Sequence, residues 1–157
     1  YDCDPPGIRQ LIDVHEEFDA PVISLMWVPD ELVSLYGMVH YEEIRDRVFR
    51  VWDMVEKPSP QKSPSNYAIV GRYIFYPDIF EIIENLPKGY GGEIQLTDGI
   101  KVLSKKSDVY GVLFKGERYD AGNIPGYIEA ILHYAMKKPD LKKIILKYIK
   151  ERKYEFT

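Results

Sequence analysis

A carboxylate and an ammonium group stand side by side at Glu56 and Lys57, immediately before Pro58 and at the end of a predicted strand. A carboxylate accepts hydrogen bonds from hydroxyl groups, and a lysine ammonium binds phosphate as a compact point charge. The pair therefore has the chemistry to hold a sugar phosphate. A surface ion pair explains the same two residues, since exposed charges are common at strand ends and contribute only ~0–1 kcal/mol to stability.

A second carboxylate, Asp120, falls at the end of a predicted short strand, and Gly122 follows two residues later. Magnesium is usually bound through one or two carboxylates together with phosphate oxygens, so Asp120 is a candidate metal ligand. An Asx-turn, in which the Asp side chain accepts a hydrogen bond from the backbone two residues on, accounts for the spacing equally well. The residues alone leave both alternatives open.

Glycines mark two further positions. Gly37 lies between a predicted helical turn and a strand, where the absence of a side chain lets the backbone approach a ligand. Residues 89–92, Gly-Tyr-Gly-Gly, precede a predicted helix as in a phosphate cradle, but Glu93 would repel an anion there. Two roles remain open for Glu93: a favourable interaction with the helix dipole, or the binding of a hydroxyl group. The pattern is neither a P-loop nor a dinucleotide-binding fingerprint.

Composition argues against several classes of protein. The formal net charge is −4 at pH 7, and no long basic cluster precedes the C-terminal segment, so no nucleic-acid partner is expected. No apolar run approaches the ~20 residues of a membrane-spanning helix, so no membrane partner is expected either. His15, His40 and His133 are far apart and accompany no nucleophile signature, which favours structural roles. The single Cys3 allows no internal disulfide, which fits a reducing cytoplasm.

Hydrophobic periodicity predicts an α/β fold with a mixed sheet flanked by helices. Strands are expected at 21–28, 38–41, 47–56 and 66–76, and as a pair at 109–114 and 117–120. Helices are expected at 7–18, 77–86, 93–105, 124–138 and 141–153. Pro139 and Asp140 separate the last two helices as breaker and N-cap, and we expect this C-terminal pair to pack outside the sheet. The length of 157 residues predicts one compact domain.

Five strings occur in the order found in one family: YGMV at 36–39, VEKP at 55–58, AIVGRYIF at 68–75, GGEIQLTD at 91–98 and RYDAGNIPGYIEA at 118–130. Together they resemble the bacterial and archaeal UTP–glucose-1-phosphate uridylyltransferases, within the nucleotidyltransferase branch of the sugar-1-phosphate pyrophosphorylases. The resemblance covers nearly the whole chain. GGEIQLTD and RYDAG are its specific strings, and GGEIQLTD is more similar to the uridylyltransferase version than to the thymidylyltransferase version.

The resemblance implies the nucleotide-diphospho-sugar transferase fold and a reaction in which glucose 1-phosphate attacks the α-phosphorus of UTP. The products would be UDP-glucose and pyrophosphate, with Mg²⁺ balancing the charge. It implies that Glu56 holds sugar hydroxyls and that Lys57 contacts the phosphates. It places Gly37 and Gly122 at the substrate and makes Asp120 a metal ligand, so that Lys57 and Asp120 are the catalytic residues.

The resemblance also implies parts that these 157 residues do not contain, namely the glycine-rich nucleotide loop, the basic motif and the second metal-binding aspartate that open family members. We therefore expect residues 1–157 to be the C-terminal, sugar-phosphate-binding part of such a domain, truncated and inactive alone. We expect the enzyme to be a cytoplasmic homo-oligomer. The alternatives are a non-catalytic sugar-phosphate-binding or assembly module and a thymidylyltransferase-type relative.

Overall fold

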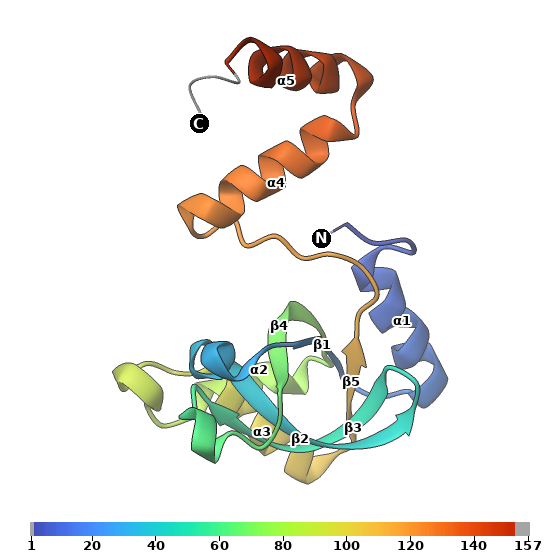
Figure 1. Ribbon diagram of the computed structural model, residues 1–157. Coiled ribbons are helices and arrows are strands. Elements are labelled where there is room, and N and C mark those ends of the chain that lie inside the picture. Colours follow the sequence, from blue (N-terminus) through green and yellow to red (C-terminus); the bar gives the residue numbers. More distant parts are fainter. Residues whose placement is uncertain (1, 153–157) are drawn as a thin grey trace. The chain divides into compact units, whose positions relative to one another are not determined.

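The computed structural model describes residues 2–152, which fall into two compact units (Figure 1). The first unit runs from Asp2 to Gly116, and the second begins at Glu117. The single compact domain expected from the length is therefore corrected, because the helices after Gly116 pack on each other and form a separate cluster of contacts. The assignment of residues 1–157 to one part of a nucleotidyltransferase domain stays a prediction.

The first unit is built on a mixed sheet. Its strands are β1 (Val22–Trp27), β2 (Gly37–Arg45), β3 (Val48–Glu56), β4 (Tyr67–Ile74) and β5 (Val109–Leu113). They are hydrogen-bonded in the order β1-β4-β2-β3-β5, and β5 returns to β1 so that the sheet closes on itself. The pairing of β1 with β5 is parallel and the other pairings are antiparallel. The predicted α/β class with a mixed sheet is confirmed.

Helices and short 3₁₀ turns accompany this sheet. The α-helices are α1 (Gly7–Phe18), α2 (Asp78–Glu84) and α3 (Leu96–Lys106). The 3₁₀ turns are η1 (Asp30–Leu35), η2 (Pro60–Lys62) and η3 (Tyr90–Gly92). Helix α1 packs on β1 and β4, whereas α3 packs on β3 and on α2. This last arrangement places the N-terminal end of α3 against the strand that carries Glu56.

The core explains why the segment 21–28 reads as a continuous apolar run. Ile23 and Leu25 of β1 are fully buried in the largest apolar cluster, which also holds Ile100 of α3. Val22 is fully buried in a second cluster, against Leu11 of α1. The strand is thus covered on both faces, as predicted, and burial of this kind stabilises a fold by about 25 cal/mol for each Å² of apolar surface removed from water.

Two of the predicted boundaries that are wrong concern candidate site residues. Residues 117–120 form no strand element: Glu117 makes only an isolated β-bridge, and the next three residues pair with no strand. Asp120 therefore does not follow a strand. The helix expected from Glu93 begins three residues later, because Gly91 and Gly92 adopt positive φ angles of 69° and 78° and hold the preceding residues in η3.

The second unit contains the helices α4 (Ile124–Met136) and α5 (Pro139–Glu151), which contact each other. Asn123 caps α4, since its side-chain oxygen accepts a hydrogen bond of 2.9 Å from the Gly126 amide. Lys138, and not Asp140, occupies the N-cap position of α5, because Pro139 already takes a helical conformation in the first turn. Lys153, in the predicted last helix, lies outside the described residues. The packing of this pair outside the sheet stays a prediction.

Candidate functional site

Glu56 is the last residue of β3, and its position is determined by the register with β2. In that register Glu56 pairs with Gly37, the first residue of β2. Strand pairing therefore brings together two candidates that are separated by most of a hairpin in the sequence. The Glu56 side chain is only 14% exposed, so its carboxylate lies largely within the protein.

The nearest polar partner of the Glu56 carboxylate is a hydroxyl from another element. Thr97, the second residue of α3, donates a hydrogen bond of 2.6 Å from Oγ1 to Glu56 Oε2. A buried carboxylate is costly unless it is hydrogen-bonded, so this contact accounts for how the charge is tolerated. The carboxylate is held by α3 at one oxygen.

Gly37 is needed where it stands, because its backbone lies against both of these side chains. A Cβ atom at this position would lie 2.9 Å from Thr97 Oγ1 and 3.0 Å from Glu56 Oε2. Side-chain carbon atoms do not normally approach other atoms this closely. The observed close neighbours of Gly37 are thus the side chains of Glu56 and Thr97, and the approach of its backbone to a ligand stays a prediction.

Lys57 follows β3 in a left-handed backbone conformation, with φ of 45°. A non-glycine residue in this region carries a cost of roughly 1–2 kcal/mol. Its amide donates a hydrogen bond of 3.0 Å to the Tyr36 carbonyl, which continues the strand pairing by one residue. Its ammonium nitrogen lies 5.1 Å from the centre of the Tyr90 ring, within the range of a cation–π contact. Asp19 and Arg47 have similar φ angles of 47° and 63° outside the candidate site, so this conformation by itself does not mark Lys57 as functional.

The geometry bears on the alternative of a simple surface ion pair. Lys57 Nζ lies 3.9 Å from Glu56 Oε1, which is too long for a hydrogen bond. The shorter contact of Glu56 is the one from Thr97, and the carboxylate is mostly covered. An exposed pair held only by mutual attraction therefore describes these two residues poorly, because Thr97 fixes the Glu56 carboxylate and the Lys57 ammonium lies over the Tyr90 ring without a hydrogen bond to Glu56.

The glycine-rich turn is arranged differently from a phosphate cradle. The Gly89 amide donates to the Glu93 carbonyl at 2.8 Å, and the Gln95 side chain donates to the Tyr90 carbonyl at 2.9 Å. The turn thus satisfies its own backbone groups. Glu93 is exposed and precedes the N-cap residue Gln95, so it is not in the first turn of α3 and the dipole explanation loses its basis.

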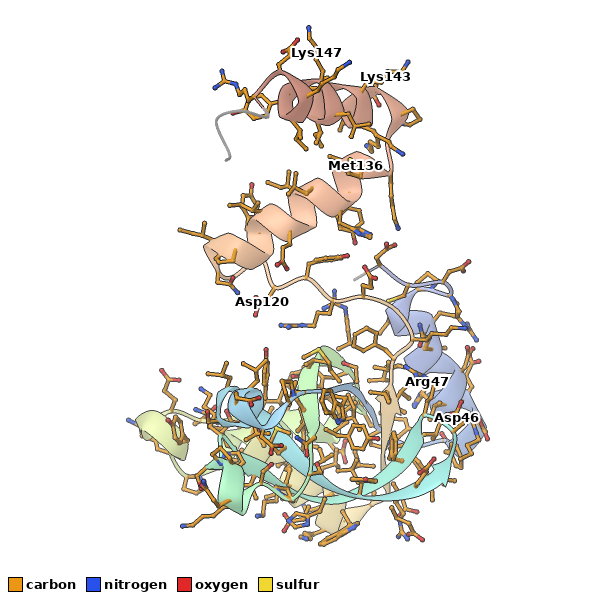
Figure 2. All side chains as sticks on the ribbon, in the orientation of Figure 1. Asp46, Arg47, Asp120, Met136, Lys143 and Lys147 are labelled. Atoms are coloured by element: carbon orange, nitrogen blue, oxygen red, sulfur yellow. The ribbon has the colours of Figure 1, made fainter. Side chains whose placement is uncertain are left out.

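Asp120 belongs to the second unit, in the segment that leads into α4 (Figure 2). Its Oδ1 accepts a hydrogen bond of 3.0 Å from the Gly122 amide, which is the Asx-turn that the spacing allowed. Its Oδ2 lies 3.4 Å from Arg118 Nη2. The side chain is still 45% exposed, so both oxygens keep lone pairs for a further partner. The turn holds the Asp120 carboxylate in place and leaves it able to accept a further hydrogen bond or to bind a metal ion.

Among residues 2–152, no three His, Cys, Asp or Glu side chains gather closely enough to hold a metal ion. Asp120 by itself could supply one carboxylate ligand, and Mg²⁺ in proteins commonly uses one or two carboxylates together with phosphate and water oxygens. His15, His40 and His133 lie on three different elements, α1, β2 and α4.

Thr97 and Tyr90 are the site residues that reasoning from the sequence missed. Thr97 lies inside the string GGEIQLTD, which marks the family, so that string was a signal for it. Tyr90 lies in the glycine-rich turn, which was considered only as a phosphate-binding site. A local sequence pattern does not show that its ring lies near the Lys57 ammonium. Both residues act across elements and were invisible to spacing alone.

This fold, a mixed sheet with a carboxylate and an ammonium at the end of β3, is that of the nucleotidyl transferases. The chain belongs to the nucleotidyl transferase family, since residues 3–137 match the model of that family. The family generally uses a divalent metal ion.

Two curated relatives and one solved structure are similar to most of this chain. The chain is 40% identical over 150 residues to the UTP–glucose-1-phosphate uridylyltransferase of Staphylococcus haemolyticus, covering 96% of this chain and 52% of that protein. It is 45% identical over 123 residues to the enzyme of the same name from Pseudomonas aeruginosa, covering 78% of this chain and 44% of that protein. A crystal structure of UDP-glucose pyrophosphorylase complexed with UDP-glucose superposes with a TM-score of 0.82 at 38% identity, over 85% of this chain and 51% of that one.

The chain thus spans about half the length of the curated relatives it matches. The resemblance inferred from the five strings is confirmed. Within residues 2–152, no helix is both long and apolar enough to cross a membrane.

Proposed function

We propose that this chain is the sugar-phosphate-binding part of a UTP–glucose-1-phosphate uridylyltransferase. The observation that carries the proposal is the Glu56 carboxylate at the end of β3, held by Thr97 at 2.6 Å and followed at once by the Lys57 ammonium. A fixed acceptor beside a partly exposed cation is complementary to a sugar that carries both hydroxyl groups and a phosphate. The names of the similar proteins support glucose 1-phosphate as that sugar phosphate.

In the proposed reaction a phosphate oxygen of glucose 1-phosphate attacks the α-phosphorus of UTP, and UDP-glucose and pyrophosphate form. Glu56 accepts hydrogen bonds from sugar hydroxyls, and Gly37 lets the β2 backbone come close to the sugar. Lys57 stabilises the negative charge of the phosphates, and Gly122 lies in the turn that orients Asp120. Such a reaction depends on positioning and charge neutralisation, and no covalent enzyme intermediate is required.

We propose Mg²⁺ as the divalent metal ion, with Asp120 as one ligand. A bound Mg²⁺ would supply charge stabilisation at the phosphate oxygens. The exposed Asp120 carboxylate, oriented by Gly122 and Arg118, supports this role. UTP and glucose 1-phosphate are the proposed substrates, and we expect a homo-oligomeric, cytoplasmic enzyme without nucleic-acid or membrane partners.

The test is Glu56→Gln in the complete enzyme that carries this chain. Gln keeps the size of the side chain and one acceptor oxygen but removes the charge, so we expect the KM for glucose 1-phosphate to rise by about tenfold or more. The KM for UTP should stay within about twofold of the wild-type value. Equal, small changes in both constants would favour the surface-pair interpretation of Glu56 and Lys57.

The alternatives are a non-catalytic sugar-phosphate-binding or assembly module and a thymidylyltransferase-type relative. Because the chain spans about half the length of its relatives, we expect no uridylyl transfer from these 157 residues alone. Pyrophosphate release by the complete enzyme, measured with UTP and with dTTP, separates the three. No release with either nucleotide favours the module, and faster release with dTTP favours the relative.

A further inference from the structure

The two carboxylate oxygens of Glu56 have different partners. Oε2 accepts the Thr97 hydroxyl at 2.6 Å, and this oxygen also faces Gly37. Oε1 is the oxygen that lies toward Lys57 Nζ, at a distance of 3.9 Å that leaves its lone pairs uncommitted. Oε1 is therefore the oxygen with acceptor capacity for a ligand hydroxyl, beside the ammonium.

The hydroxyl of Thr97 is committed in the same way. A threonine hydroxyl has one hydrogen, and here it is donated to Glu56. Toward a ligand the Thr97 oxygen can then only accept, so Thr97 and Glu56 both present acceptors to groups that donate. Rotation of the Glu56 side chain away from α3 would lose this contact, so the Thr97 hydroxyl favours the observed position of the Glu56 carboxylate.

We propose that Thr97 is a positioning residue for sugar recognition: it holds Glu56 by Oε2 so that Oε1 is presented to a sugar hydroxyl next to the Lys57 ammonium. This inference rests on the proposed function of Glu56 and adds a residue from α3 to it. The contact between α3 and β3 would thus contribute to the binding of the sugar hydroxyls. It would not affect the binding of UTP.

The experiment compares Thr97→Val and Thr97→Ser in the complete enzyme. Val has the same branched shape without the hydroxyl, and Ser keeps the hydroxyl without the methyl group. Hydrogen bonds to charged groups are the stronger ones, so Thr97→Val should raise the KM for glucose 1-phosphate about tenfold, with the KM for UTP and kcat within about twofold. Thr97→Ser should keep the KM for glucose 1-phosphate within about threefold of the wild-type value.

Two controls separate positioning from a general structural role. Ser104, also on α3, has its hydroxyl oxygen 2.9 Å from the Lys101 carbonyl and 3.2 Å from the Trp52 carbonyl of β3. Ser104→Ala therefore removes a hydroxyl from the contact between the same two elements and should leave both KM values unchanged. In a Glu56→Gln background, Thr97→Val should add little, because it acts through Glu56. Independent, additive effects of the two substitutions would overturn the inference.

The outcomes also distinguish this inference from the function on which it rests. If Glu56→Gln leaves the KM for glucose 1-phosphate unchanged, the proposed function fails and the role of Thr97 fails with it. If Glu56→Gln raises that KM and Thr97→Val does not, only the positioning role is overturned. If Thr97→Val raises the KM for both substrates alike, or Thr97→Ser behaves like Val, the hydroxyl has no role in recognition.

Discussion

Lys101 Nζ lies 3.0 Å from Asp53 Oδ1, and this ion pair joins α3 to β3, the two elements that bring Thr97 to Glu56. Lys101 follows Thr97 by four residues, about one helical turn, and Asp53 precedes Glu56 by three. The same Asp53 oxygen accepts a hydrogen bond of 2.8 Å from the Met54 amide. We infer that the pair helps to fix how α3 lies against β3, and hence where Thr97 stands.

The first prediction concerns this ion pair and pH. Burial alone would raise the pKa of Asp53, but the hydrogen bonds from Lys101 and the Met54 amide, with the charges of Lys101 and Lys105, outweigh it and lower that pKa. A lowered carboxyl pKa stabilises the folded state above the unfolded pKa, and this contribution is lost as the pH falls through the folded pKa.

Asp53→Asn should therefore lower the free energy of unfolding at pH 7 by about 1 kcal/mol or less, because the pair is partly exposed. The difference from wild type should shrink as the pH falls below about 4, where the carboxyl group begins to protonate. Urea unfolding at pH 7 and at a series of acidic values measures it. A deficit that is the same at every pH would mean that the charge of Asp53 does not contribute.

The second prediction is that Gly37→Ala disturbs recognition more than folding. The added methyl group meets the Thr97 and Glu56 side chains, which can shift, so we expect a loss of about 1 kcal/mol in stability and a raised KM for glucose 1-phosphate. Gly71→Ala is the matched control, because a Cβ there has no neighbour within 4 Å. The KM for glucose 1-phosphate and the thermal unfolding of both variants test this prediction. Identical values for the two variants would mean that Gly37 has no role in the site.

The third prediction separates the backbone of Lys57 from its charge. Gly adopts the left-handed conformation without steric cost, so Lys57→Gly should leave the free energy of unfolding unchanged or raise it by up to about 1 kcal/mol. Lys57→Met keeps a long side chain and the strain. Both variants should lose at least about tenfold in kcat, because both lack the ammonium at the phosphates. Retained turnover in either variant would contradict the assigned role.

The fourth prediction is that Asp120→Asn keeps the fold and cuts turnover by about two orders of magnitude. Asn can still accept the Gly122 amide, so the turn should survive, whereas the charge at the metal is lost. The control is Asp140→Asn, which removes an exposed carboxylate from the first turn of α5. Turnover is measured during a magnesium titration up to saturation. An unchanged metal optimum with unchanged turnover would leave Asp120 as a turn residue only.

Local patterns were sufficient for most elements of the fold. The helix 7–18 was predicted with its observed bounds, and the buried run at 21–28 was recognised as a strand covered on both faces. Such elements depend on the period of apolar residues and on prolines and glycines nearby, all of which lie within a few residues of each other. For the same reason Glu56 and Lys57 could be singled out from the sequence as an acceptor and a cation at a strand end.

Tertiary structure alone decided which partners these residues have. Thr97 meets Glu56 across 41 positions of sequence, and Gly37 meets both because of the β2–β3 register and the packing of α3 on β3. Asp120 was predicted at a strand end, and the structure puts it in a turn, where it accepts the Gly122 amide and lies 3.4 Å from Arg118. Periodicity reports which face of an element is buried; it carries no information about which side chain of a distant element will lie against it.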